Sequence, residues 1–171
     1  MVECEYRRDE TKIYADRAGP SKMAEAIAMI RTYESSKPEG ERICYDPYAV
    51  RFINPKILEY AAKHRDEANA AIENSTGSIV ARVRYFDDFV RKLINERLEQ
   101  LVILGAGYDT RAYRIEELKG RVKVFEVDHP GTQHFKMEKI KEIFGSIPEH
   151  VVYVPIDFEK ETLSEELFAK G

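Results

Sequence analysis

The strongest constraint in this 171-residue chain is a run of four aliphatic residues, Leu101–Leu104, followed at once by Gly105-Ala106-Gly107. The run is typical of a buried strand, and the glycines predict a tight turn into a helix. Gly105 lets the chain reverse sharply, and Gly107 removes a Cβ where the backbone approaches a ligand closely. The helix after the turn presents unpaired N–H groups. The segment therefore predicts a ligand-binding turn of the kind found in nucleotide-binding folds.

The residues after the glycines narrow the choice of ligand. The dinucleotide pattern Gly-x-Gly-x-x-Gly would need a third glycine where this chain has Thr110, and Asp109 places a carboxylate beside the turn. A phosphate group is disfavoured there because like charges repel. The acid suits a ligand with a cationic amine and hydroxyl groups, such as S-adenosylmethionine. The alternative is a glycine-rich turn of an α/β fold that binds no ligand.

The composition argues against several classes of partner. With 27 basic and 31 acidic residues and a net charge of -4, the chain lacks the positive field that attracts nucleic acid. No apolar run approaches the roughly 18 residues that span a bilayer, so no membrane partner is expected. Cys4 and Cys44 have no metal-ligand spacing, which argues against a metal site and against a disulfide framework. Because the two cysteines form no disulfide framework, we expect a reducing, cytoplasmic setting. The length of the chain fits one domain.

The first part of the chain shows helical patterns. Apolar spacing predicts a helix over 21–36. Asp46-Pro47 and Asn54-Pro55 each combine a capping residue with a proline that fits the first turn of a helix. The first pair predicts a short helix, and the second predicts a helix that continues to about residue 72.

A strongly amphipathic helix is predicted after a break at 75–78. Its apolar face is formed by Ile79, Val80, Val83, Phe86, Phe89, Val90, Leu93 and Ile94. For most of the charged residues on its other face we expect exposure to solvent: Arg82, Arg84, Asp87, Asp88, Arg91 and Lys92.

After Gly107 the pattern changes to alternating helices and strands. Helices are predicted over 110–118, over 130–144 and from 162, with strands over 122–128 and 151–157 between them. This alternation predicts an α/β fold with a doubly wound parallel sheet and right-handed crossovers. We divide the chain into an N-terminal helical region, 1–97, and the sheet-containing part, 98–171.

Each predicted strand delivers candidate site residues at its carboxyl end, where open parallel sheets bind their ligands. Asp128 follows the second strand and can accept hydrogen bonds from the two hydroxyls of a ribose. Asp157 follows the third and can accept from an adenine amine, with Phe158 against the ring. The alternatives are that Asp128 caps the helix after Pro130 and that Asp157 only stabilises a turn.

At these residues the chain resembles the leucine carboxyl methyltransferase-like family of S-adenosylmethionine-dependent methyltransferases. The resemblance covers about residues 20 to 171. The matching blocks are 46–49 (Asp-Pro-Tyr-Ala), 82–87 (Arg-Val-Arg-Tyr-Phe-Asp), 104–111 (Leu-Gly-Ala-Gly-Tyr-Asp-Thr-Arg), 125–130 (Phe-Glu-Val-Asp-His-Pro) with Gln133 and Lys136, and 154–158 (Val-Pro-Ile-Asp-Phe).

The resemblance implies a Rossmann-like sheet of the class I methyltransferase type and S-adenosyl-L-methionine as cofactor. Arg82 would meet the carboxylate of the cofactor, the turn its methionine portion, Asp128 its ribose, and Asp157 with Phe158 its adenine. The cofactor-binding residues expected in this way are Arg82, Gly105, Ala106, Gly107, Asp109, Asp128, His129, Asp157 and Phe158. A basic residue of the family's first helix has no evident equivalent here, and no catalytic residue is assigned.

Members of the family continue past a third strand to a fourth, so the sheet is expected to be truncated and to have an open apolar edge. The activity implied is methyl transfer to an oxygen, a carboxylate or hydroxyl of a small molecule or a protein. The alternative is a catalytically incomplete module that binds the cofactor or forms a homodimer through the open edge. A nicotinamide-dependent oxidoreductase is disfavoured by Asp109 and Thr110.

Overall fold

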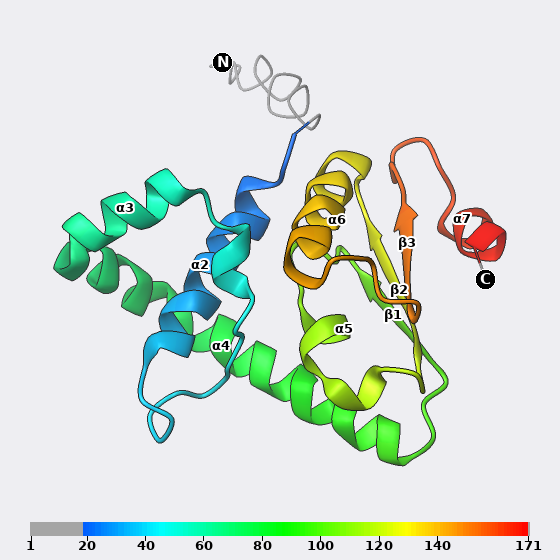
Figure 1. Ribbon diagram of the computed structural model, residues 1–171, viewed down its shortest axis with the longest axis horizontal. Helices are drawn as coiled ribbons and strands as arrows, with labels where there is room; N and C mark the ends of the chain where they lie inside the picture. Colours follow the sequence, from blue (N-terminus) through cyan, green and yellow to red (C-terminus); the bar gives the residue numbers. More distant parts are fainter. Residues whose placement is uncertain (1–18, 171) are drawn as a thin grey trace, which may run out of the picture.

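The computed structural model describes residues 19–170, which form a helical part followed by a three-stranded sheet with helices on both faces (Figure 1). The predictions that concern residues 1–18, including the one on Cys4, lie outside the described residues. The helices are α2 (Lys22–Ser36), η1 (Ala49–Phe52), α3 (Pro55–Lys63), α4 (Arg65–Asn95), α5 (Arg111–Arg114), η2 (Glu116–Leu118), α6 (Pro130–Phe144) and α7 (Leu163–Lys170). The strands are β1 (Gln100–Leu104), β2 (Lys123–Asp128) and β3 (Val151–Pro155).

The sheet is parallel throughout and has the order β1-β2-β3, which confirms the predicted α/β class. Leu104 pairs with Val127, and Asp128 pairs with Pro155, so all three strands end at the same side of the molecule. The turn after β1 continues this register because the Ala106 N–H donates to the Val127 carbonyl oxygen at 3.0 Å. The expected site residues thus follow strands that end together.

Alternation along β2 places the two sides of the sheet in different cores. Val124 packs with Ile140 of α6, in the cluster that also holds residues of η1 and α4. Phe125 and Val127 face the other way and pack with Leu163 and Leu167 of α7. One core therefore joins the helical part to the sheet, and the division of the chain at residue 97 stays a prediction.

The helices α2 and α3 each begin after a residue whose side chain caps the first turn. The Ser21 hydroxyl accepts the Ala24 N–H at 3.2 Å, and the Asn54 side chain accepts the Lys56 N–H at 3.0 Å. The predicted helix that would reach residue 72 was wrong, because α3 ends at Lys63 and α4 begins at Arg65.

The predicted break at 75–78 was also wrong, because α4 is one 31-residue helix through this segment. The Thr76 hydroxyl donates to the Ile72 carbonyl oxygen at 3.0 Å, one turn back along the helix. Thr76 and Val80 are buried against neighbouring residues, so tertiary packing offsets the weak helix propensity of this stretch. The long helix connects the helical part to the sheet (Figure 1).

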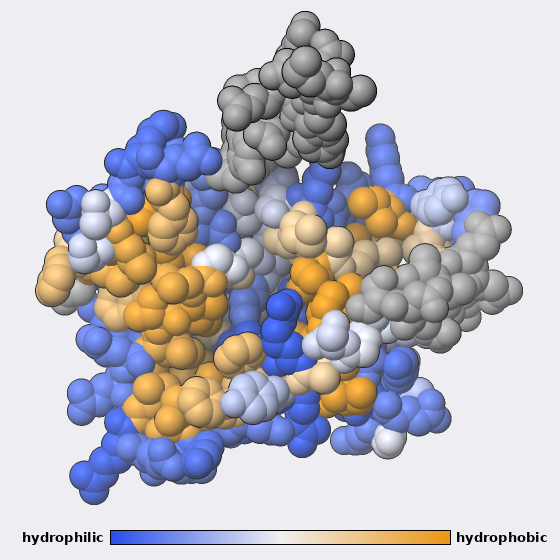
Figure 2. Space-filling view, turned by 180° about the vertical axis from the view of Figure 1, so that it is seen from behind, coloured by the Kyte–Doolittle hydropathy of each residue, from blue (hydrophilic) through white to orange (hydrophobic). Residues whose placement is uncertain are grey.

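The edge of β1 is not paired with another strand within the described residues. Val102 and Leu104 are 43% and 58% exposed, although they share a face with the covered Phe125 and Val127. On the apolar face of α4, Phe86 and Phe89 are each 43% exposed. Hydrophobic side chains form a broad patch on the sheet side of the molecule (Figure 2).

Candidate functional site

The turn after β1 needs glycine at two positions. Gly105 has φ +62° and Gly107 has φ +45°, values that L side chains rarely adopt. A Cβ on Gly107 would lie 3.2 Å from the Cβ of Ala24, because α2 passes directly against the turn. A Cβ on Gly105 would meet nothing within 4 Å, so open space lies in front of this residue. Ala106 between them is buried.

Asp128 joins the end of β2 to this turn. Its carboxylate accepts hydrogen bonds from the Gly107 N–H and, at 2.6 Å, from the N–H of His129. The side chain that caps α6 is that of His129, whose Nδ1 accepts the Gly131 N–H at 3.3 Å. Asp128 is therefore not the helix cap of the alternative interpretation, and it remains partly exposed beside the turn.

A cavity of about 590 Å³ lies between α4 and the edge of β1, in front of the turn. Its polar lining comes from Arg31, Arg82, Gly105, Asp109 and Arg111. Its apolar lining is formed by Val83, Phe86, Phe89, Val90, Leu93, Leu101, Val102, Ile103 and Leu104. The structure thus brings three of the expected residues, Arg82, Gly105 and Asp109, to one cavity.

Sequence reasoning missed Arg31, which reaches this cavity from α2. It is 4% exposed, donates from Nη2 to the Tyr108 carbonyl oxygen at 2.6 Å, and lies 3.4 Å from Asp46. Its buried Nε has no hydrogen-bond partner among the described residues. The available signal was helical spacing, because Arg31 lies three or four residues after the apolar Ile27 and Ala28 and so shares their helix face.

The carboxylate of Asp109 is bound by Arg111, both through the Arg111 N–H at 2.8 Å and through its guanidinium. Burial alone would raise the pKa of Asp109, but the charges of Arg111, Arg31 and Lys136 outweigh it and hold the pKa below its usual value. The acid beside the turn is therefore ionised and already paired within the chain.

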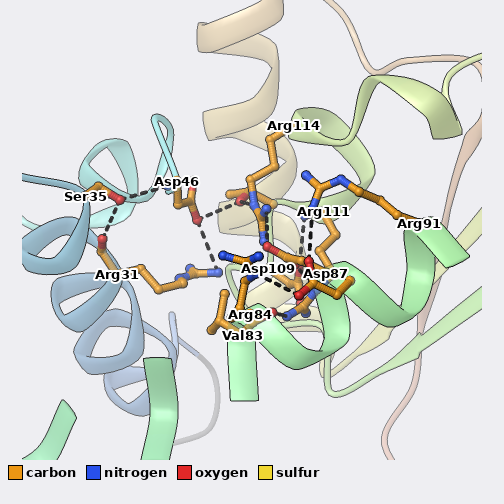
Figure 3. Close-up of polar contacts among 12 residues, drawn as sticks. Arg31, Ser35, Asp46, Val83, Arg84, Asp87, Arg91, Asp109, Arg111 and Arg114 are labelled. Carbon is orange, nitrogen blue, oxygen red and sulfur yellow. Dashed lines mark hydrogen bonds and ion pairs between the residues drawn. The ribbon is translucent and has the colours of Figure 1, made fainter. Parts of the chain in front are cut away.

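The pairing continues to Asp87 on α4 (Figure 3). Asp87 accepts from Arg111 Nε at 2.8 Å and from the two terminal nitrogens of Arg114 at 2.6 and 2.7 Å. Burial alone would lower the pKa of Arg114, but its bonds to Asp87 outweigh burial and raise it. The prediction that the charged face of α4 is solvated was wrong for Asp87, which is 3% exposed. Asp87 shares a helix face with Val83, Val90 and Ile94, and this helical spacing could have indicated that Asp87 is buried.

Asp46 connects the first part of the chain to the same network (Figure 3). Its carboxylate accepts the Tyr48 and Ala49 N–H groups at 3.0 and 3.1 Å and the Thr110 hydroxyl at 2.7 Å. The threonine that replaces the third glycine is completely buried and also accepts from Arg114 at 3.1 Å. Residue 110 thus connects the turn to the segment before η1.

Asp157 and Phe158 do not line the cavity. Asp157 pairs with Lys160 at 2.7 Å and accepts the Glu159 N–H at 3.1 Å. These bonds stabilise the turn after β3 and lower the pKa of the Asp157 carboxyl group. Phe158 is 57% exposed. Both follow Ile156, whose N–H donates to the Asp128 carbonyl oxygen at 2.9 Å, so they begin next to Asp128 at the same edge of the sheet.

Gln133 and Lys136 of α6 form a buried network behind the site. Gln133 donates to the Glu126 carbonyl oxygen at 2.8 Å, and the Lys136 ammonium lies 2.7 Å from the Glu126 carboxylate. Burial raises the pKa of Glu126 even beside this cation. These residues hold β2 against α6.

Within 19–170, no group of three or more His, Cys, Asp or Glu side chains is arranged to hold a metal ion. None of the helices described is both long and apolar enough to cross a membrane.

Comparison with known proteins matched the leucine carboxyl methyltransferase family over residues 24–171. The chain is 40% identical over 136 residues to the Bacillus subtilis (strain 168) protein named "Putative S-adenosyl-L-methionine-dependent methyltransferase YktD", covering 80% of this chain and 40% of that protein. Two further relatives are each named "Putative S-adenosyl-L-methionine-dependent methyltransferase". The protein of Mycobacterium sp. (strain KMS) is 31% identical, and the match covers 80% of this chain and 54% of that protein. The protein of Mycobacterium avium (strain 104) is also 31% identical, and the match covers 88% of this chain and 52% of that protein. The chain thus spans about half the length of these curated relatives.

The Asp87 network predicts unequal effects for two neighbouring aspartates on α4. Asp87→Ala leaves the buried Arg114 guanidinium without its carboxylate and should lower the free energy of unfolding by about 3 to 5 kcal/mol. Asp88→Ala removes an exposed pair with Arg84 and should cost less than about 1 kcal/mol. Urea unfolding of both variants checks this, and equal losses would contradict it.

The lowered pKa of Asp109 predicts an acid-dependent stability. Because its folded pKa lies below the usual 3.8, the stabilisation is fully present above that pH and is lost as the pH falls through the lower folded value. Urea unfolding from about pH 6 down to about pH 2.5 should show a shallower acid loss in Asp109→Asn than in the unmodified chain. Parallel profiles would exclude Asp109 as a source of the acid sensitivity.

Proposed function

Because this chain belongs to the leucine carboxyl methyltransferase family, we propose that it binds S-adenosylmethionine and serves the transfer of its methyl group. The observation that carries the proposal is the cavity at the carboxyl end of β1, where Arg31 and Arg82 meet Gly105. Two guanidiniums suit the carboxylate of the cofactor's methionine portion. The unpartnered Nε of Arg31 supplies a buried donor, and the open space at Gly105 lets a ligand approach the backbone.

Asp128 is the proposed ribose ligand. An ionised carboxylate has about four acceptor sites, and two are used by the N–H groups of Gly107 and His129. The remaining two can accept from a pair of neighbouring hydroxyls. We propose that Asp157 and Phe158 contact the adenine, since they follow Ile156, which is bonded to the Asp128 backbone.

When bound, S-adenosylmethionine supplies an electrophilic methyl group on a sulfonium. The contribution of this chain is to hold that group in one orientation, through a turn fixed by Asp128 and by the pairing of Asp109 with Arg111. We propose an oxygen acceptor, a carboxylate or hydroxyl of a small molecule or protein, in keeping with the description of the matched family. A cytoplasmic location stays a prediction from the cysteine content.

A second candidate function is a cofactor-binding module that pairs with another copy of itself. It is favoured by the exposed Val102 and Leu104 beside the edge of β1, which no strand pairs within residues 19–170. Exposed apolar strand edges are prone to association, and a second copy would cover this one.

Calorimetric titration with S-adenosylmethionine tests the proposed cofactor site. We expect a dissociation constant in the roughly micromolar range for the unmodified chain. Asp128→Asn should weaken binding at least about tenfold because it removes a charged acceptor. Asp88→Asn, an exposed aspartate on α4, is the matched control and should bind normally.

A folded chain that binds no S-adenosylmethionine would refute the cofactor assignment. Binding that is equal in the unmodified chain and in Asp128→Asn would refute the role of Asp128 alone.

The module hypothesis predicts a homodimer by light scattering. Leu104→Asp places a charge on the exposed edge of the sheet and should give a monomer. Tyr60→Asp on α3, at an equally exposed position, should leave the mass unchanged. A monomeric mass for the unmodified chain would reject the homodimer.

A further inference from the structure

A second cavity of about 500 Å³ lies away from the β1 edge, between the segment before η1, α4 and α5. Its lining includes three buried residues, Cys44, Asp87 and Arg114. None of the three lines the cavity in front of the glycine turn. This cavity is therefore separate from the proposed cofactor site and has its own set of charged side chains.

Most charged groups around this cavity are already paired. Arg114 is held by two hydrogen bonds from its terminal nitrogens to Asp87. Arg84 donates to Asp88 at 2.7 Å. Glu116, the carboxylate from η2, is paired with Lys119 at 2.6 Å. These pairs leave little net charge of their own.

Two further guanidiniums, those of Arg42 and Arg91, line the cavity in ion pairs that are longer than a hydrogen bond. Arg42 lies 4.0 Å from the centroid of the Tyr45 ring and 3.9 Å from Glu39, whose side chain is 92% exposed. Arg91 lies 4.0 Å from Asp88, a carboxylate that Arg84 already binds, and 3.9 Å from Glu117. These separations exceed hydrogen-bond length, so the N–H donors of both arginines remain available. Arg91 extends from α4 toward the cluster around Arg114 and Asp87 (Figure 3).

We propose that this cavity binds a small oxyanion, a phosphate or carboxylate group, between Arg42 and Arg91. A guanidinium presents a rigid fork of donors that matches the oxygens of such groups. The Tyr45 ring is a cation–π partner of Arg42 and helps to position this guanidinium. The paired Arg114 and Asp87 also line the cavity.

Calorimetric titration of the 171-residue chain tests the site, with inorganic phosphate in one arm and malonate in the other. Ionic strength is held constant with sodium chloride, because screening changes any surface charge effect. The variants are Arg42→Gln and Arg91→Gln. Arg121→Gln, an exposed arginine before β2, is the control that removes the same charge elsewhere.

We expect saturable binding of at least one anion, weakened about tenfold or more in Arg42→Gln and Arg91→Gln and unchanged in Arg121→Gln. The arm that binds more tightly identifies the oxyanion. The absence of saturable binding in both arms would overturn the proposal, as would equal binding by all three variants. Far-ultraviolet circular dichroism of each variant shows that a loss of binding is not a loss of fold.

Discussion

The arrangement of the candidate site depends on one buried carboxylate, Asp87 of α4. It receives three hydrogen bonds from Arg111 and Arg114 of α5, and Arg111 continues to Asp109 in the glycine turn. A buried charge is costly unless it is paired, so α4 and α5 have one favourable register. That register places Arg82 of α4 on the same cavity as the turn.

The same network explains why the turn departs from the dinucleotide pattern. Thr110 provides a hydroxyl that bonds Asp46 at 2.7 Å, a contact that glycine could not make. Asp46 also lies 3.4 Å from Arg31, which reaches the cavity from α2. Arg31 therefore both joins α2 to the turn, through its bond to the Tyr108 carbonyl oxygen, and lines the cavity in which the ligand is proposed to bind.

Local patterns predicted the sheet and the ends of its strands well. The bounds of α6 agree with the predicted 130–144, because Pro130 starts it and Gly145 ends it in the left-handed conformation. Asp128 falls beside the turn because parallel strands of matched register end together. These features depend on residues close in sequence or on the topology of the sheet.

The features that the prediction missed depend mainly on contacts between distant residues. The continuity of α4 through Gly77 requires packing of Thr76 and Val80, which no local signal shows. Arg31 is buried by its bond to the Tyr108 carbonyl oxygen, 77 residues away. The burial of Asp87 was visible as helical spacing, but its charge favoured an exposed interpretation.

The central claim is that S-adenosylmethionine binds in front of the turn that Asp87 and Asp128 hold in place. The most direct measurement is a nuclear magnetic resonance titration of the nitrogen-15-labelled chain with S-adenosylmethionine. We expect the largest shifts at the backbone amides of Gly105, Gly107 and His129 and at the Arg31 side chain. Saturable shifts confined to other parts of the chain, with these signals unmoved, would contradict it.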